Sequence, residues 1–150
     1  MSITAPSPYT IILTHEHADF DALASLLAAA RLYPQAVPVL PRQRNRNLDA
    51  FLAIYRDLLP FVRLEDLPRR RIDQVILVDT QTVQPVRGMG AHTTGHIVDH
   101  HPQMRELPPG WSFSGEEVGA TTTLLVRQLA EGGVALNATE ATLLLLGIYE

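Results

Sequence analysis

Short runs of apolar residues alternate along this chain with longer stretches in which apolar positions recur three and four residues apart. The short runs predict strands over 9–14, 36–40, 74–79 and 96–99, with a weaker strand near 111–114. The periodic stretches predict helices over 20–33, 47–59 and 120–131, and a last helix that begins near Asn137. Asn137 and Glu140 have the spacing of a capping box, while Asp49 and Pro60 suit the first turn and the end of the second helix.

Strands that are apolar throughout and separated by helices indicate an α/β fold, with a mostly parallel sheet and helices on both faces. The length of 150 residues fits one domain, and a hydrophobic content of 46% is enough for a packed core. In an open parallel sheet, ligands bind beyond the carboxyl ends of the strands, near a switch in strand order. Polar residues that directly follow the strands are therefore the first candidates for chemistry.

Three polar clusters stand at such strand ends: His15, Asp19 and Asp21; then Asp79; then Asp99, His100 and His101. The His-x-x-x-Asp-x-Asp spacing at a strand-to-helix turn can direct one imidazole and two carboxylates into the same cleft. Two divalent cations that activate a shared water need about this many ligands. Asp79 could bridge the two cations and His100 could complete the second set. Asp99 could hold the imidazoles in the required tautomer, leaving His101 free for a phosphate or leaving group.

Each cluster alone has a simpler interpretation. Asp19 could cap the first helix, and His15 alone could be a hydrogen-bonded buried histidine. The stretch VGATTTLL, 118–125, could offer helix N–H groups and hydroxyls to an anion, or it could be an ordinary helix entry with a threonine cap. The remaining histidines, His17, His92 and His96, are predicted to be structural or exposed. The convergence of all three clusters favours the metal interpretation.

Composition narrows the chemistry further. The chain has no cysteine, which excludes disulfides and thiolate ligands and leaves His, Asp and Glu for any metal. Its 12 basic residues are all arginine and face 16 acids, so the net charge of −4 argues against nucleic-acid binding over the whole surface. We interpret the arginines at 42–46 and 69–71 as solvated loop charge. With no long apolar stretch and no signal peptide, the chain is predicted to be cytoplasmic and to avoid membranes.

Four motifs in this order resemble the DHH superfamily of phosphoesterases, named for the triplet found here as Asp99-His100-His101. The other three are His15-x-x-x-Asp19-x-Asp21, Val78-Asp79-Thr80 and Gly119-Ala120-Thr121-Thr122. Within the superfamily, the segments 14–34 and 119–150 are most similar to the N-terminal domain of large bacterial proteins. In those proteins a DHH domain and its companion domain precede CBS domains and a tRNA nucleotidyltransferase or poly(A) polymerase module.

The resemblance implies a dinuclear site for Mn²⁺ or Mg²⁺. One ion would be held by His15, Asp19 and Asp79, and the other by Asp21, Asp79 and His100. His101 and Asp99 would be the catalytic pair, and phosphate would be bound by His101, Gly119, Thr121 and Thr122. The implied reaction is hydrolysis of P–O bonds in a nucleotide, a short oligonucleotide or an RNA 3′ end.

Two other functions stay open at this point. One is a non-catalytic nucleotide- or tRNA-binding module of a fused nucleotidyltransferase, with the Arg42–Arg46 loop on phosphates. The other is an inorganic pyrophosphatase, although His17 stands where related pyrophosphatases commonly have Asn. The segment LLLLGIYE stops inside an apolar helix with no Gly, Asn or Pro to close it, so we expect a piece of a longer protein. The resemblance also implies a further aspartate of the second metal site just after Glu150. Alone, this chain should be weakly active or inactive, and its apolar last helix should promote self-association.

Overall fold

The structure is a computed structural model and describes residues 7–150. Its strands form one six-stranded sheet in the order β3-β2-β1-β4-β5-β6, and every neighbouring pair is parallel. Their bounds are β1 (Thr10–Leu13), β2 (Val37–Leu40), β3 (Val62–Arg63), β4 (Gln74–Val78), β5 (Thr94–Val98) and β6 (Trp111–Ser114). The strand order reverses between β1 and β4, so the carboxyl ends of these two strands form the switch point at which ligands bind in such sheets.

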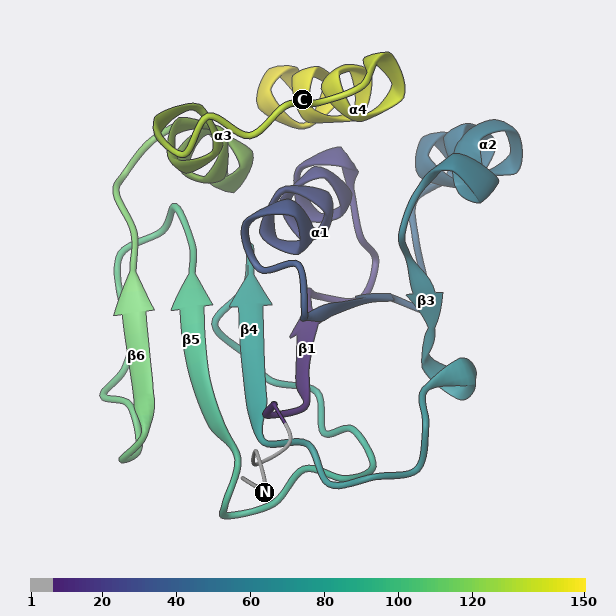
Figure 1. Cartoon of the computed structure of the whole chain (residues 1–150). Helices are drawn as coiled ribbons and strands as arrows, with labels where there is room; N and C mark the ends of the chain where they lie inside the picture. The colour runs from purple at the N-terminus through teal and green to yellow at the C-terminus, as the bar shows by residue number, and fades with distance from the viewer. Residues whose placement is uncertain (1–6) are drawn as a thin grey trace, which may run out of the picture.

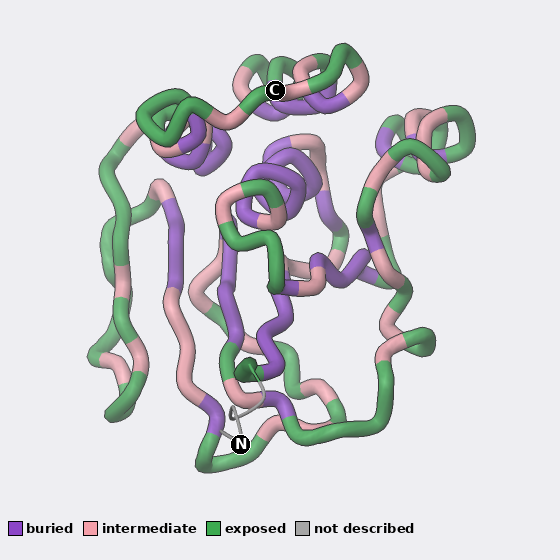
Figure 2. The backbone as a smooth tube through the Cα atoms, viewed as in Figure 1, coloured by how far each residue is buried: buried purple, intermediate pink, exposed green. Residues whose placement is uncertain are grey.

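The helices stack in two layers above one face of the sheet (Figure 1). They are α1 (Phe20–Leu32), α2 (Arg46–Tyr55), α3 (Thr121–Glu131) and α4 (Ala138–Tyr149). Helix α1 lies between the sheet and the α3–α4 pair, and residues 21–29 are buried without interruption (Figure 2). A helix covered on all sides must be apolar all round, which explains its run of alanines and leucines.

The α/β fold with a parallel sheet is confirmed, but the second face of the sheet differs from the expectation of helices on both sides. Loops and the short 3₁₀ turn η2 (Leu64–Asp66) cover that face, packing residues such as Val83, Val86 and Leu107 onto the sheet. The connections after β4 and β5 cross this side because parallel crossovers are right-handed. These connections contain several prolines and glycines and no helical period, so they remain irregular.

All the predicted strands and helices are present, with small changes at their ends. Strand β3 was not predicted; it has only two residues and is defined by its pairing with β2. The second helix ends at Tyr55 rather than 59, and the chain continues as the 3₁₀ turn η1 (Arg56–Leu58). The capping box of Asn137 and Glu140 starts α4 as expected. Within residues 7–150, no helix has the length and apolar character needed to cross a membrane.

Candidate metal centre

The carboxyl ends of β1, β4 and β5 bring the three polar clusters to one edge of the sheet. His15 lies two residues after β1, Asp79 directly follows β4, and His100 lies two residues after β5. The turn after β1 leads into α1, whose N-cap and first turn carry Asp19 and Asp21. Because β1, β4 and β5 are parallel neighbours, residues 64 and 85 positions apart in the chain meet here.

Asp79 lies between the two histidines. Its Oδ2 is 3.2 Å from His15 Nε2, and its Oδ1 is 3.5 Å from His100 Nε2. The backbone of Asp79 has φ = +60°, a left-handed conformation that is strained for most residues but tolerated by aspartate. Strain of this kind is common where a side chain must be held in one direction for function. The two carboxylate oxygens of Asp79 thus face two different imidazoles, that of His15 after β1 and that of His100 after β5.

Asp21 occupies the N-terminus of α3, although it belongs to α1. Its carboxylate accepts hydrogen bonds from the N–H groups of Thr121 at 3.1 Å and Thr122 at 2.9 Å, and from Thr122 Oγ1 at 2.7 Å. A carboxylate at this position is stabilised by the unpaired N–H groups and the helix dipole. Asp21 is thus a cap supplied by a neighbouring helix, since Ala120 at the N-cap of α3 has no side-chain oxygen.

Thr121 and Thr122 are hydrogen-bonded to the carboxylates of the site. Both are fully buried, and Thr121 Oγ1 donates to Asp79 Oδ1 at 2.9 Å while Thr122 serves Asp21. The N-cap of α3 is Ala120, so the alternative of a threonine cap is wrong. Phosphate binding by the two threonines stays a prediction. Of the predicted phosphate-binding set, Gly119 and His101 line the open cavity.

The two candidate imidazole ligands are oriented by backbone carbonyls. His15 Nδ1 lies 2.8 Å from Glu16 O, and His100 Nδ1 lies 2.8 Å from Val118 O. A carbonyl can only accept, so each Nδ1 carries the proton and each Nε2 faces the carboxylates. This orientation leaves an Nε2 lone pair for a metal whenever that nitrogen is deprotonated.

Asp99 holds His101, not the metal-facing imidazoles that we expected it to orient. Its carboxylate is buried, accepts from Gln81 Nε2 at 2.9 Å, and lies 3.2 Å from His101 Nδ1. The backbone bends at His100 and His101, which brings His101 Nδ1 to the Asp99 carboxylate and leaves the two imidazole rings side by side, with centroids 4.0 Å apart. The side chain of His101 is 60% exposed, so its Nε2 edge can meet a ligand in solvent.

The closely spaced carboxylates of Asp21 and Asp79 favour a positive charge between them. Burial, together with the Asp21 carboxylate, raises the pKa of Asp79 to about 6, although hydrogen bonds from His15 and Thr121 act in the opposite direction. The hydrogen bond to Asp79 raises the pKa of His15 to about 9, against the effect of its own burial. Among residues 7–150, the ion pairs of Asp21 and Asp79 involve histidines and no arginine. A proton on His15 therefore supplies charge that a metal ion could supply more fully.

Two groups of potential ligands meet the spacing of a metal site. Each group offers one ligand atom per residue within 4.8 Å of the others, and the groups are His15, Asp19 and Asp79, and Asp21, Asp79 and His100. A third such group, Asp99, His100 and His101, adjoins them. Asp19 also accepts from Ala22 N at 3.0 Å, so it is a helix cap as well as a candidate ligand. A cavity of about 320 Å³ opens onto the first two groups.

Glu150 and Gln81 belong to this site but were missed from the sequence. Glu150 Oε2 accepts from Asp21 N at 3.0 Å and lines the cavity, and burial raises the pKa of Glu150. It reaches the site only because α4 packs on α1, a contact that no local signal encodes. Gln81 anchors Asp99 and stands two residues after Asp79. A polar residue just beyond the end of a strand that carries a candidate metal ligand is a signal that could have identified it.

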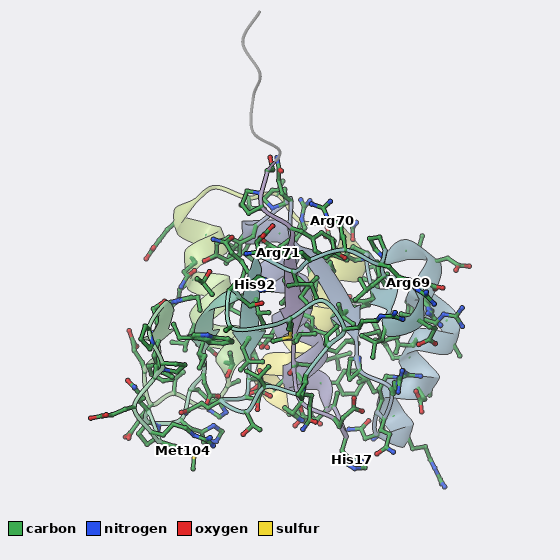
Figure 3. All side chains as sticks on the ribbon, turned by 90° about the horizontal axis from the view of Figure 1, so that it is seen from below. His17, Arg69, Arg70, Arg71, His92 and Met104 are labelled. Atoms are coloured by element: carbon green, nitrogen blue, oxygen red, sulfur yellow. The ribbon has the colours of Figure 1, made fainter. Side chains whose placement is uncertain are left out.

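The other predicted residues lie away from the cluster or at its margin. His17 and His92 are exposed, and His96 contacts Ser112 Oγ at 2.6 Å, as expected for surface or structural histidines. Figure 3 places His17 and His92 at opposite ends of the molecule. Arg44 pairs with Asp49 at 2.7 Å, while Arg42 and Arg46 are exposed.

Residues 9–148 match the DHH family, N-terminal domain. The chain belongs to the DHH family. This DHH domain is 39% identical to an A-adding tRNA nucleotidyltransferase of Geobacter sulfurreducens and 34% identical to one of Aquifex aeolicus. Each match covers 93% of this chain, which spans 17% of the Geobacter protein and 16% of the Aquifex protein.

More distant relatives share the same fold. A probable manganese-dependent inorganic pyrophosphatase of Listeria innocua is 27% identical over 93% of this DHH domain and 46% of the relative. Among solved structures, a candidate family II inorganic pyrophosphatase of Methanococcus jannaschii superposes with a TM-score of 0.67 at 19% identity. That match covers 92% of this chain and 46% of the other, and it supports the α/β fold.

Proposed function

We propose that this DHH domain is a metal-dependent phosphoesterase. It would hydrolyse P–O bonds in nucleotides, short oligonucleotides or RNA 3′ ends, with two divalent cations, Mn²⁺ or Mg²⁺. The observation that carries the proposal is the position of Asp79, whose two carboxylate oxygens face imidazoles of different ligand groups. Hard carboxylate oxygens with borderline imidazoles suit these cations.

The proposed cation ligands form two sets that share Asp79. His15, Asp19 and Asp79 would hold one cation, and Asp21, Asp79 and His100 the other. When bound, the cations would polarise the phosphoryl group and lower the pKa of a water molecule. Thr121 and Thr122 keep the carboxylates of Asp79 and Asp21 in position through buried hydrogen bonds.

His101 is the candidate for proton transfer. The Asp99 carboxylate accepts a hydrogen bond from His101 Nδ1–H, which fixes the ring and leaves Nε2 toward solvent at the cavity. A protonated Nε2 can bind a phosphoryl oxygen or give its proton to the leaving oxygen. Similarity to manganese-dependent pyrophosphatases supports Mn²⁺ as the working cation.

A phosphoester panel with Mn²⁺ tests the proposal. We expect Asp79→Asn to reduce hydrolysis to background, and His101→Gln to lower kcat by roughly a hundredfold or more. Asp66→Asn, an exposed carboxylate that pairs with Arg63 at 3.1 Å, is the matched control and should be unchanged. Hydrolysis that survives Asp79→Asn would rule the proposed site out.

The similarity to A-adding tRNA nucleotidyltransferases favours a second candidate, a nucleotide- or tRNA-binding module without hydrolytic activity. A longer protein containing this domain would then add nucleotides normally and hydrolyse no member of the panel. Pyrophosphate belongs in the same panel because of the similarity to pyrophosphatases. Preference for pyrophosphate over every ester would favour that activity.

A further inference from the structure

A cluster of basic side chains lies at the end of the molecule opposite the metal centre. We name it the basic end, and its members are Arg69, Arg70, Arg71, Arg87 and His92. The two loops that carry it precede β4 and β5 and lie side by side, since Ile72 N donates to Gly88 O at 2.9 Å. A Cβ added at Gly88 would come within 2.4 Å of Arg70 O, which confirms how closely the loops approach.

The loop-covered face shows the separation of the two ends. In Figure 3, Arg69, Arg70, Arg71 and His92 lie at one end, while His17 and Met104 lie at the other. His17 and Met104 belong to the loops after β1 and β5, the same strand ends that carry the metal centre. A strand of five residues spans roughly 17 Å, so the two sites are separated by at least about that distance.

The basic end carries little compensating negative charge. All five side chains belong to exposed residues. Among residues 7–150, the ion pairs within 4.0 Å include one from this cluster, Arg71 Nε to Asp73 Oδ1 at the long distance of 3.9 Å. The other oxygen of Asp73 accepts from Tyr9 N at 2.8 Å, and the guanidinium of Arg70 is held 4.5 Å from the centroid of the Tyr9 ring. Four of the 12 arginines of an acidic chain are thus gathered at one end.

We infer that the basic end binds the sugar–phosphate backbone of a nucleic acid. Guanidinium groups present a planar set of donors that matches phosphate oxygens in pairs, which ammonium groups do not. A local cluster of exposed arginines on a chain of net charge −4 concentrates the positive potential on one face, where a polyanion would be attracted. The inference goes beyond the proposed hydrolysis, because no residue of the metal centre takes part.

Fluorescence anisotropy with the whole chain tests this inference. The probes are labelled RNA and DNA strands of equal length and sequence, and EDTA in the buffer prevents metal-dependent binding or cleavage. The test variant is Arg69→Gln with Arg71→Gln. The matched control is Arg105→Gln with Arg127→Gln, which removes equal charge from exposed positions after β5 and on α3.

We expect the test variant to bind about tenfold more weakly at low salt. The slope of the logarithm of the binding constant against the logarithm of salt concentration should become shallower by roughly 0.7–0.9 per lost arginine contact. The control should bind like the unmodified chain, and Arg87→Gln alone should give a smaller loss. Stronger binding of RNA than of DNA would identify RNA as the nucleic acid that the basic end prefers. Absence of binding, an equal loss in the control, or equally tight capture of polyglutamate would overturn the inference. Each outcome is independent of whether the domain hydrolyses anything.

Discussion

Two buried carboxylates, Asp21 and Asp79, are held by threonines as well as by histidines. Asp21 receives three hydrogen bonds from Thr121 and Thr122, and Asp79 receives one from Thr121 Oγ1. An ionised carboxylate in a buried position is costly unless donors surround it. The threonines therefore stabilise negative charge at the site before any metal binds.

Thr121→Val should lower the free energy of unfolding by about 1–3 kcal/mol, because it leaves Asp79 Oδ1 and His100 N each without a buried partner. Urea denaturation in EDTA measures the effect without metal. Thr142→Val is the matched control, since the Thr142 hydroxyl donates to Ala138 O on an exposed helix surface. The control should change stability by less than about 0.5 kcal/mol. Equal losses in the two variants would contradict the role assigned to Thr121.

Metal binding should strengthen as the pH rises, because a cation must displace the proton from His15 Nε2. The hydrogen bond to Asp79 raises the pKa of His15 to about 9, so this nitrogen is mostly protonated at pH 7. Calorimetry should show Mn²⁺ affinity rising between about pH 6.5 and pH 9, with protons released on binding. His15→Gln should remove that pH dependence. Affinity that stays flat over this range in the unmodified chain would contradict the assignment.

The same pKa shift has the opposite consequence for the metal-free fold. A folded-state pKa above the unfolded value stabilises the folded state below about pH 6.5, and this stabilisation is lost as the pH rises through about 9. Unfolding in EDTA should therefore show the advantage of the unmodified chain over His15→Gln shrinking across that window. Cation binding would restore stability at high pH.

At the level of elements, α1 is the support on which the site is assembled. It lies between the sheet and the α3–α4 pair, and its first turn meets the start of α3 and the end of α4. Gly147 allows α4 to approach closely: a Cβ there would stand 2.4 Å from Ala24 Cβ and 2.7 Å from Thr122 Oγ1. Close packing of these helices thus places Glu150 against Asp21.

Gly147→Ala should destabilise the fold by about 1–3 kcal/mol, since the added methyl group forces α4 away from α1. It should also weaken Mn²⁺ binding through displacement of Thr122. Gly132→Ala is the control, because its φ of −81° suits alanine and the nearest atom is 3.4 Å from the added Cβ. Chemical denaturation should find the control neutral or slightly stabilised. A neutral Gly147→Ala would contradict the close packing.

For the whole molecule, the sequence predicted the central strands of the sheet better than its edge strand β3 or the loops that cover its second face. The apolar runs 74–79 and 96–99 identified β4 and β5 because buried parallel strands need no polar alternation. The metal-centre candidates followed, since the carboxyl ends of neighbouring parallel strands must meet. Strand β3 could not be predicted, because two residues carry no period and the strand exists only through pairing with β2.

Contacts between elements far apart in the chain could not be predicted from the sequence either. The partners of Thr121 and Thr122 depend on how α3 docks on α1, and the approach of Glu150 depends on α4. Asp99 was correctly placed at a strand end, but its partner follows from which way its side chain leaves the chain. What covers the second face of the sheet could not be predicted either, because the loops that pack on it have no helical period.

The central claim is that imidazoles and carboxylates from three strand ends form one metal centre around Asp79. Titration of the chain with Mn²⁺ by isothermal calorimetry at about pH 8 tests it most directly, with Asp79→Asn beside the exposed control Asp66→Asn. We predict saturable Mn²⁺ binding in the unmodified chain and the control, and its loss in Asp79→Asn. Absence of Mn²⁺ binding, or binding that persists unchanged in Asp79→Asn, would contradict the claim.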